Sequence, residues 1–527
     1  MKILLCAINS KYIHSNPAVY TLKAACREYA AKYGGEDGSH ICICEFSIND
    51  SHESLLFHIL EEAPHILAFS CYIWNISAVR KLCSDVRKAA PETVIVLGGP
   101  EVSFGMEHTG ISPADYDYVL SGEGEKSFYC LMSLLQDPDF TPPEETLPLW
   151  PSIYDSDSLK LFRNRIVYYE ASRGCPYRCA YCLSGACGPV TYLPMERVRA
   201  DLELFCREGV PLVKFTDRTA NCNPERFRQL LEFIKNLPDC RSVFHFEVGA
   251  DLFEEKDLEL LRTMPPGRIQ LEAGIQSTEP RALESCARHM DTGKILRNLG
   301  KIMSFGNINL HGDLIAGLPY EGYQRFGESF DTLYALRLHQ LQLGFLKLLA
   351  GAPLNQIREE HGYVFSENPP YEVVRNRYLS SRELMKLKAI EDVLERYYNS
   401  GRFRTCLPIL EKCFESPFAM YEQLGEFYRD QGLVFGKISL MNQCDLLVQF
   451  GQAQGLGEDF HKAMLYDYFS VNRQELPPER LKYLWRKVRS SRPEGVKGEP
   501  RCIGDRVYYF RYERKDPVTG VYQEDKE

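Results

Sequence analysis

The stretch RGCPYRCAYCLSGACG, residues 173–188, places four cysteines close together. Cys175, Cys179 and Cys182 have the spacing C-x3-C-x2-C, and Cys187 follows shortly after them. Structural zinc sites usually combine two separated pairs of cysteine or histidine ligands. Three thiolates on one loop instead suit three irons of a 4Fe–4S cube, with the fourth iron open to another ligand. We therefore predict a cluster bound by these three cysteines, with zinc as the alternative and Cys187 as a free thiol.

The bulk composition is that of a globular protein. The chain has 527 residues, of which 44% are hydrophobic and 25% charged, so we expect about three domains. A net charge of −10 argues against a surface that binds nucleic acid throughout. The apolar run at residues 3–8 is too short for a secretory signal, and no stretch approaches the ~20 apolar residues of a membrane span. We expect a cytoplasmic protein whose nineteen cysteines are mostly free thiols or ligands, because that compartment is reducing.

The first part of the chain alternates short apolar runs with helical stretches such as residues 76–90. This alternation predicts an open parallel α/β sheet, in which ligands bind beyond the carboxyl ends of the strands. The predicted strands are residues 2–8, 40–46, 65–72, 94–99 and 117–122.

A second α/β run follows a segment rich in proline and acidic residues. Six more strands are expected in it, after which long charged and aromatic helices such as residues 380–401 take over. The predicted domains are residues 1–135, a linker at 136–165, 166–355, and a mainly helical region at 356–527.

Tyr181 stands directly before the last cysteine of the motif. With this tyrosine, the second α/β run resembles the radical S-adenosylmethionine (SAM) superfamily, whose signature is C-x3-C-x-aromatic-C. The resemblance covers residues 166 to about 350 and implies a partial (β/α)6 barrel that binds a 4Fe–4S cluster and SAM. In coproporphyrinogen-dehydrogenase-like members, residues at matching positions contact the amino, carboxylate and ribose groups of SAM. Protein carboxylates can pair with the ammonium group or the ribose hydroxyls of SAM, and an arginine can pair with its carboxylate. The positions implied for SAM are Tyr181, Glu247, Gln276, Arg288 and Asp313. Taken singly, a glutamate at a strand end is more often a solvated or ion-paired residue.

The first region, over about residues 1–130, resembles the cobalamin-binding domain that precedes many such cores. The matching segments are FSCYIWN (69–75), LGGPEVS (97–103) and DYVLSGEGEKSF (117–128). Glycines there would let the backbone approach the corrin, and a serine would bond to the nucleotide tail. The resemblance implies cobalamin contacts for Ser70, Gly98, Gly99, Gly122 and Gly124.

One departure concerns the lower face of cobalt. Cobalamin-dependent mutases carry an Asp-x-His-x-x-Gly motif after the first strand, whereas this loop reads NSKYIHSN, with Lys11 in place of the histidine. We expect no protein ligand to cobalt, with His14 as the alternative. A plain nucleotide-binding Rossmann domain would need G-x-G-x-x-G after the first strand, which is not there.

The two resemblances together imply a cobalamin-dependent radical SAM enzyme. Such an enzyme cleaves SAM to a 5′-deoxyadenosyl radical, removes hydrogen from an unactivated carbon and transfers methyl from methylcobalamin. A small-molecule or peptide substrate, an oxygen-free environment and an electron donor such as flavodoxin or ferredoxin are expected. The alternatives are a rearrangement or ring contraction, a methylthiotransferase-like tRNA modification, and a cobalamin carrier or sensor that is not an enzyme. The carrier would not need the three cysteines.

The C-terminal region carries no catalytic motif. RLKYLWRKVRSSR, residues 480–492, has six positive residues and no acid, which indicates a solvated helix. The alternative is a contact with RNA or an acidic substrate, but the acidity of the whole chain favours the helix.

Overall fold

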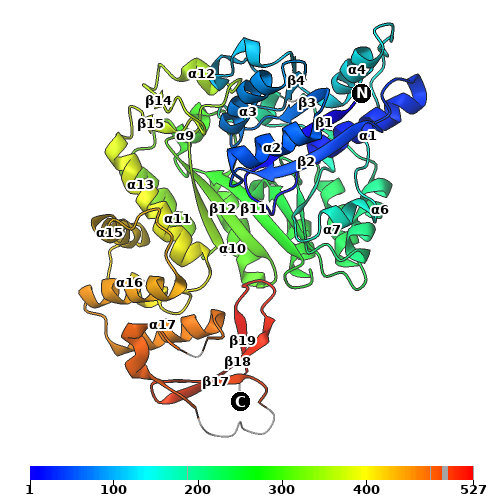
Figure 1. Cartoon of the computed structure of the whole chain (residues 1–527). Coiled ribbons are helices and arrows are strands. Elements are labelled where there is room, and N and C mark those ends of the chain that lie inside the picture. The colour runs from blue at the N-terminus through cyan, green and yellow to red at the C-terminus, as the bar shows by residue number, and fades with distance from the viewer. Residues whose placement is uncertain (187, 475, 489–495, 526–527) are drawn as a thin grey trace.

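The structure, a computed structural model, describes residues 1–186, 188–474, 476–488 and 496–525 (Figure 1). It contains two parallel sheets, followed by a region of helices and a small antiparallel sheet. The predicted class, two α/β units and a mainly helical C-terminal region, is confirmed. No helix in these described ranges is long and apolar enough to cross a membrane.

The N-terminal sheet is parallel and has the strand order β2-β1-β3-β4-β5. β1 is buried along its whole length because alternate residues face opposite sides and helices cover both. The strands are β1 (Ile3–Asn9), β2 (Ile41–Ser47), β3 (Ile66–Ser70), β4 (Val94–Gly98) and β5 (Tyr118–Leu120). The helices α1 (Pro17–Tyr33) and α4 (Gly124–Gln136) cover one face, and α2 (His52–Glu62) and α3 (Ile76–Ala89) the other.

The second sheet is a partial barrel with the order β13-β12-β11-β10-β9-β6, and its neighbouring strands are parallel. Apolar residues at every second strand position pack against the helices on the outer face. The strands are β6 (Val167–Tyr169), β9 (Leu212–Phe215), β10 (Val243–Val248), β11 (Ile269–Gln276), β12 (Asn309–Ala316) and β13 (Gln340–Phe345). The helices are α6 (Met195–Arg207), α7 (Pro224–Lys235), α8 (Glu255–Arg262), α9 (Pro280–Ser285), α10 (Thr292–Phe305) and α11 (Tyr323–Tyr334).

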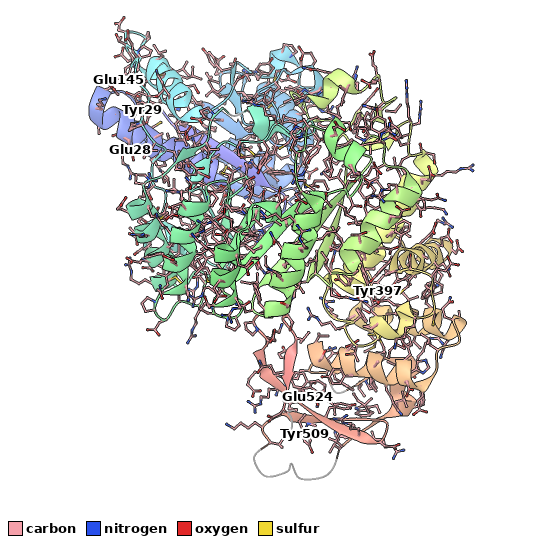
Figure 2. The ribbon with its side chains drawn as sticks, turned by 180° about the vertical axis from the view of Figure 1, so that it is seen from behind. Glu28, Tyr29, Glu145, Tyr397, Tyr509 and Glu524 are labelled. Atoms are coloured by element: carbon pink, nitrogen blue, oxygen red, sulfur yellow. A yellow bond between two sulfur atoms is a disulfide. The ribbon has the colours of Figure 1, made fainter. Side chains whose placement is uncertain are left out.

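The segment predicted as a linker contains one short helix, α5 (Ser158–Leu161), and packs on the folded units. Leu147 N donates to the Tyr29 hydroxyl at 2.9 Å, and Lys32 pairs with Glu145 at 2.7 Å. Tyr29 and Glu145 lie at the same end of the molecule in Figure 2. The linker is therefore held against α1.

The C-terminal region contains helices, as predicted, and a sheet that was not predicted. The predicted helix 380–401 starts at a capping box between Ser380 and Glu383, as α13 (Ser381–Leu394), and continues as a π-helical turn. Further helices are α12 (Leu354–Ile357), α14 (Leu407–Glu411), α15 (Pro417–Asp430), α16 (Leu440–Ala453) and α17 (Glu458–Val471). The antiparallel strands are β16 (Trp485–Arg486), β17 (Glu499–Ile503), β18 (Arg506–Lys515) and β19 (Tyr522–Glu524).

In the described part of residues 480–492, the predicted solvated helix is limited to a 3-10 segment at the start, and the rest of the prediction is wrong. A 3-10 helix at Glu479–Leu484 leads directly into β16, which pairs with β17. Residues 489–492 lie outside the described ranges, and so does Cys187.

The hairpin of β18 and β19 reaches the amino ends of the barrel strands (Figure 1). Asn309, the first residue of β12, donates from Nδ2 to Val518 O at 2.8 Å. A Cβ atom built on Gly267 would lie 2.6 Å from Pro517 O, so the chains touch closely. The tip of the hairpin thus packs against the end of the barrel opposite the carboxyl ends of its strands.

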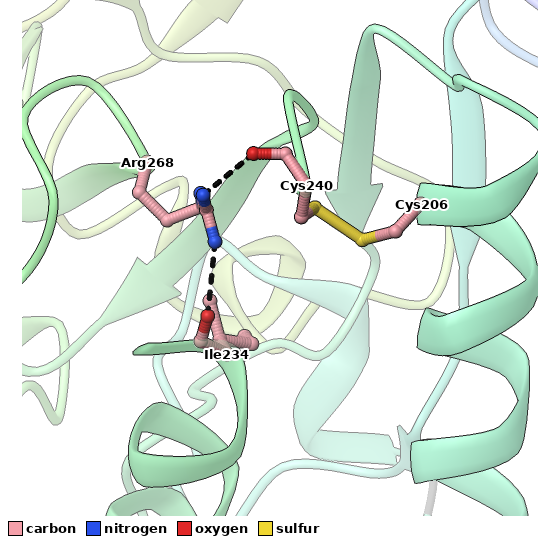
Figure 3. The surroundings of a disulfide bond; sticks show 4 residues. All are labelled: Cys206, Ile234, Cys240 and Arg268. Carbon is pink, nitrogen blue, oxygen red and sulfur yellow. Dashed lines mark hydrogen bonds between the residues drawn. A yellow bond between two sulfur atoms is a disulfide. The ribbon is translucent and has the colours of Figure 1, made fainter. Parts of the chain in front are cut away.

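One disulfide is an exception to the expected free thiols. Cys206 at the end of α6 is bonded to Cys240, and Arg268 donates to Cys240 O at 2.6 Å and to Ile234 O at 3.1 Å (Figure 3). The other described cysteines are free. Most of the chain's thiols therefore follow the prediction.

Candidate functional site

The cysteine loop begins where the short strand β7 (Ser172–Arg173) ends. Gly174 has a φ of +94°, and a Cβ built on it would lie 2.9 Å from Pro189 O, so this turn favours glycine. Cys175, Cys179 and Cys182 follow and line one cavity of about 200 Å³. Their thiols are thus brought to one place, as a cluster would require.

The same cavity collects every residue predicted for SAM. Glu247 lies near the end of β10, Gln276 ends β11, and Asp313 lies on β12. Tyr181 comes from the cysteine loop, and Arg288 from the chain that follows α9. All five line the cavity together with the three cysteines.

Several polar atoms of this cavity lack a partner. Within the ranges that the structure describes, Gln276 Oε1, Asp313 Oδ1 and Tyr181 OH are buried and make no hydrogen bond. Leaving a buried polar atom unpaired costs about 1–3 kcal/mol. Gln276 also has a φ of +71°, which is unusual for a residue with a side chain. The lining therefore suits a ligand with several polar groups, as SAM has.

The carboxylates give the cavity a preference for positive charge. Burial raises the pKa of Asp313 well above its usual value, and the nearby Glu272 and Glu247 raise it further. Burial and Glu272 likewise raise the pKa of Glu247. A cationic group among these three carboxyls would relieve their repulsion. The ammonium and sulfonium groups of SAM have the required charge.

The residues predicted for cobalamin gather at the carboxyl edge of the N-terminal sheet. Ser70 ends β3 and accepts from Asn16 Nδ2 at 3.0 Å, across the point between β1 and β3 where the strand order reverses. Ligands of open α/β sheets bind at such a point. In the described chain, the buried Asn16 Oδ1 has no partner.

The glycines of this edge allow close backbone packing at one position and leave open space at another. Gly98 ends β4, and Gly99 has a φ of +112° and lies so close to Cys71 that a Cβ would be 2.5 Å from Cys71 O. Gly122 has a φ of +75°, and a Cβ there would point into open space. Gly124 begins α4. This edge has the unpaired polar atom and the bare backbone that cobalamin would need.

His14 contacts the barrel. Its Nδ1 lies 2.6 Å from the hydroxyl of Tyr168 on β6, and burial lowers the pKa of the imidazole. Lys11 is exposed nearby. One ring nitrogen of His14 is therefore already engaged.

The inner face of the barrel is polar, which the sequence analysis missed. Glu272 Oε2 on β11 lies 2.9 Å from His245 Nε2 on β10 and 3.2 Å from Lys214 Nζ on β9. The His311 ring on β12 lies 5.7 Å from that of His245. Glu272 also lines the SAM cavity, so this polar group adjoins it. The available signal was a polar residue at every second position of the predicted buried strands.

Comparison with known proteins assigns a family model to each of the two regions that contain the parallel sheets. Residues 4–131 match the family model "B12 binding domain", and residues 169–333 match "Radical SAM superfamily". Residues 359–495 match a third model, "Protein of unknown function (DUF4080)". The chain is therefore a radical SAM protein with an N-terminal B12-binding domain. These domains imply the predicted cofactor set of a 4Fe–4S cluster, SAM and cobalamin.

Two curated relatives are similar over just over half of this chain. The 2-(S-pantetheinyl)-carbapenam-3-carboxylate methyltransferase of Streptantibioticus cattleyicolor is 25% identical over 57% of this chain and 49% of its own length. The cobalamin-dependent radical SAM methyltransferase TokK of Streptomyces tokunonensis is 26% identical over 55% of this chain and 48% of its own. The chain thus spans about half the length of these curated relatives.

Solved structures share the fold. The cobalamin-dependent SAM radical enzyme OxsB, with aqua-cobalamin and SAM bound, has a TM-score of 0.54 at 14% identity, covering 88% of this chain and 79% of OxsB. The radical SAM methyltransferase TsrM of Kitasatospora setae, with cobalamin and a [4Fe-4S] cluster bound, has a TM-score of 0.53 at 17% identity. That match covers 69% of this chain and 76% of TsrM.

Proposed function

We propose that this protein is a cobalamin-dependent radical SAM C-methyltransferase. The observation that carries the proposal is the single cavity lined by the three cysteines and the five predicted SAM residues, with unpaired polar atoms among them. The curated relatives named as methyltransferases support the reaction type. In this proposal residues 1–135 hold cobalamin, 136–165 link the domains, 166–355 hold the cluster and SAM, and 356–527 form the C-terminal domain.

Bound together, the cluster and SAM supply a radical that removes a hydrogen atom from carbon, and cobalamin supplies the methyl group that replaces it. Cys175, Cys179 and Cys182 would hold the cluster through their thiolates. Arg288 would pair with the SAM carboxylate through its guanidinium. The remaining cavity residues hold its ammonium and ribose groups.

The polar inner face of the barrel favours a hydrophilic substrate. Lys214, His245 and Glu272 present both signs of charge beside the SAM cavity. Burying an apolar substrate against these groups would leave them without water, at a cost in free energy. We therefore propose a small polar molecule or a peptide, with flavodoxin or ferredoxin as electron donor. A reducing cytoplasm fits the many free thiols.

The test is anaerobic incubation of the purified holoenzyme with methyl-deuterated SAM and a small-molecule cell extract, followed by mass spectrometry. A methyltransferase gives a product that carries the deuterated methyl group, together with 5′-deoxyadenosine. Formation of 5′-deoxyadenosine with an isomerised, unlabelled product would instead establish the rearrangement. Absence of both 5′-deoxyadenosine and labelled product would contradict the proposed function.

A further inference from the structure

Arg173 joins the cysteine loop to the glycine-rich loop of the B12-binding domain. It stands two residues before Cys175, and its Nη2 lies 2.6 Å from Oε1 of Glu125 in the first turn of α4. Gly122 and Gly124, predicted to contact cobalamin, lie directly before Glu125, where the glycine-rich loop leads into α4. One side chain therefore spans the two cofactor-binding segments.

The surroundings of Arg173 hold its guanidinium in one position. Its Nε lies 2.8 Å from Glu170, its Nη1 lies 3.6 Å from Glu123, and its Cζ lies 4.5 Å from the centre of the Trp150 ring. The Arg173 side chain is 20% exposed and that of Glu125 15%. Ion pairs this well enclosed are screened by water far less than surface pairs. A planar guanidinium paired along two edges and stacked on a ring also has little freedom to turn.

Further contacts among the described residues join the two domains before the cysteine loop begins. Ser15 Oγ donates to Ile166 O at 3.0 Å, and Arg165 pairs with Glu45. They join the domains at the start of β6, before the cysteine motif. Arg173 acts at the loop that carries the cysteines.

We propose that Arg173 is a positioning residue that holds the cluster-bearing loop at a set distance from the cobalamin-binding loop. The inference rests on the proposed function, because it assigns a cofactor to each loop. A methyl group that passes from SAM to cobalt must cross the space between the two loops. Removing Arg173 leaves Glu125 and Glu170 close together without their shared cation, so the loops should move apart.

The chain offers a matched control. Arg228 lies 2.7 Å from Asp257, 2.7 Å from Glu254 and 3.7 Å from Glu225, and its side chain is 18% exposed. Its three partners belong to the radical SAM domain alone. Arg228→Ala therefore removes an equivalent charge network without touching the contact between the domains.

The first readout is the distance between the reduced cluster and cob(II)alamin, which are both paramagnetic, measured by pulsed EPR on the full chain. In Arg173→Ala and in Glu125→Gln we expect a longer and broader distance distribution. Arg173→Lys should restore part of the wild-type distribution, and Arg228→Ala should keep all of it. Glu125→Gln keeps the size of the side chain, so it serves as the test if Arg173→Ala does not fold.

The second readout separates two fates of SAM, with titanium(III) citrate as the reductant. Transfer of the methyl cation from SAM to reduced cobalt leaves S-adenosylhomocysteine, whereas reductive cleavage at the cluster leaves 5′-deoxyadenosine and methionine. In Arg173→Ala, S-adenosylhomocysteine formation should fall about tenfold to a hundredfold, because a misplacement of ~1 Å costs about 10²-fold. The rate of 5′-deoxyadenosine formation at equal cluster content should stay within about twofold, because the cysteines and the predicted SAM residues line one cavity of the radical SAM domain and that reaction does not need the B12-binding domain.

The outcomes are distinct. If Arg173→Ala and Glu125→Gln keep the wild-type distance and the wild-type ratio of the two products, the inference is overturned and the network is structural, like that of Arg228. If the wild-type protein binds no cobalamin, the proposed function fails, and the inference with it.

Discussion

Arg288 donates a hydrogen bond from Nη1 to Cys179 Sγ at 3.5 Å, although 109 residues separate the two in the chain. The Nη2 of the same guanidinium is hydrogen-bonded to Gly274 O on β11. Arg288 therefore connects the cysteine loop with the middle of the barrel. A residue predicted for SAM and a residue predicted for the cluster thus touch directly.

Arg288→Ala and Asp313→Asn should each weaken SAM binding by roughly ten- to a hundredfold, because each removes a charge-assisted contact worth about 1.5–3 kcal/mol. Equilibrium dialysis of SAM at fixed cluster content measures the effect. Arg281→Ala is the control, since Arg281 stacks on the Tyr320 ring at 4.3 Å, outside the cavity. Wild-type affinity in both cavity variants would contradict the SAM assignment.

Replacing Cys175, Cys179 and Cys182 together with alanine should abolish the cluster, while Cys222→Ala should retain it. Cys222 Sγ lies 3.3 Å from the Tyr192 hydroxyl and is expected to be an ordinary free thiol. Iron analysis and the visible spectrum of anaerobically reconstituted protein measure the outcome. About four irons per chain in the triple variant would refute the assignment.

His14→Ala should leave the EPR spectrum of bound cob(II)alamin unchanged, because His14 Nδ1 contacts Tyr168 and the sequence analysis predicts no protein ligand to cobalt. The comparison is made on wild-type and variant protein loaded with the same cobalamin. A nitrogen hyperfine pattern that is present in the wild type and lost in the variant would identify His14 as the ligand.

The contribution of Glu321 to the stability of the barrel should fall as the pH rises from about 4.5 to about 7. Glu321 is fully buried, and burial raises its pKa from 4.5 to about 7. The folded state then holds a proton that the unfolded state releases, so this group's contribution is complete below about pH 4.5 and is lost between there and pH 7.

The expected loss is about 3 kcal/mol over that range. Glu321→Gln should flatten the fall of the unfolding midpoint between about pH 4.5 and pH 7. Glu328→Gln is the control, because Glu328 has a 64% exposed side chain on the neighbouring helix α11. Equal pH slopes in wild type and Glu321→Gln would contradict the assignment.

Much of the fold was predictable because buried parallel strands are short apolar runs. ILLCAI, residues 3–8, is a short apolar run ended by polar residues, which predicts a buried strand, and the structure buries it completely. The cysteine loop was equally readable, because its spacing has a chemical meaning that does not depend on the rest of the chain.

The structural features that could not be predicted depend on contacts between residues far apart in the chain. The polar residues His245 and Glu272 alternate with apolar ones, but the same pattern occurs on strands that face solvent, so the enclosed inner face appears only when the barrel curves. Many acidic residues lie about as far from Arg173 along the chain as Glu125 does. The pairing of Arg173 with Glu125 becomes visible only when the two domains are packed together. β18 has the aromatic alternation of a strand, yet its pairing with β17 required the folded chain.

The hairpin that packs against the amino end of the barrel also sets an order for biosynthesis. Asn309 meets its partner Val518 across 209 residues, so the ribosome must add all of these before the contact can form. Chains fold from the amino terminus as they emerge, and the two sheets are therefore complete while this end of the barrel is still uncovered. During translation there is thus an interval in which the amino end of the nascent barrel is accessible to other molecules. This interval ends when the hairpin of β18 and β19 has left the ribosome.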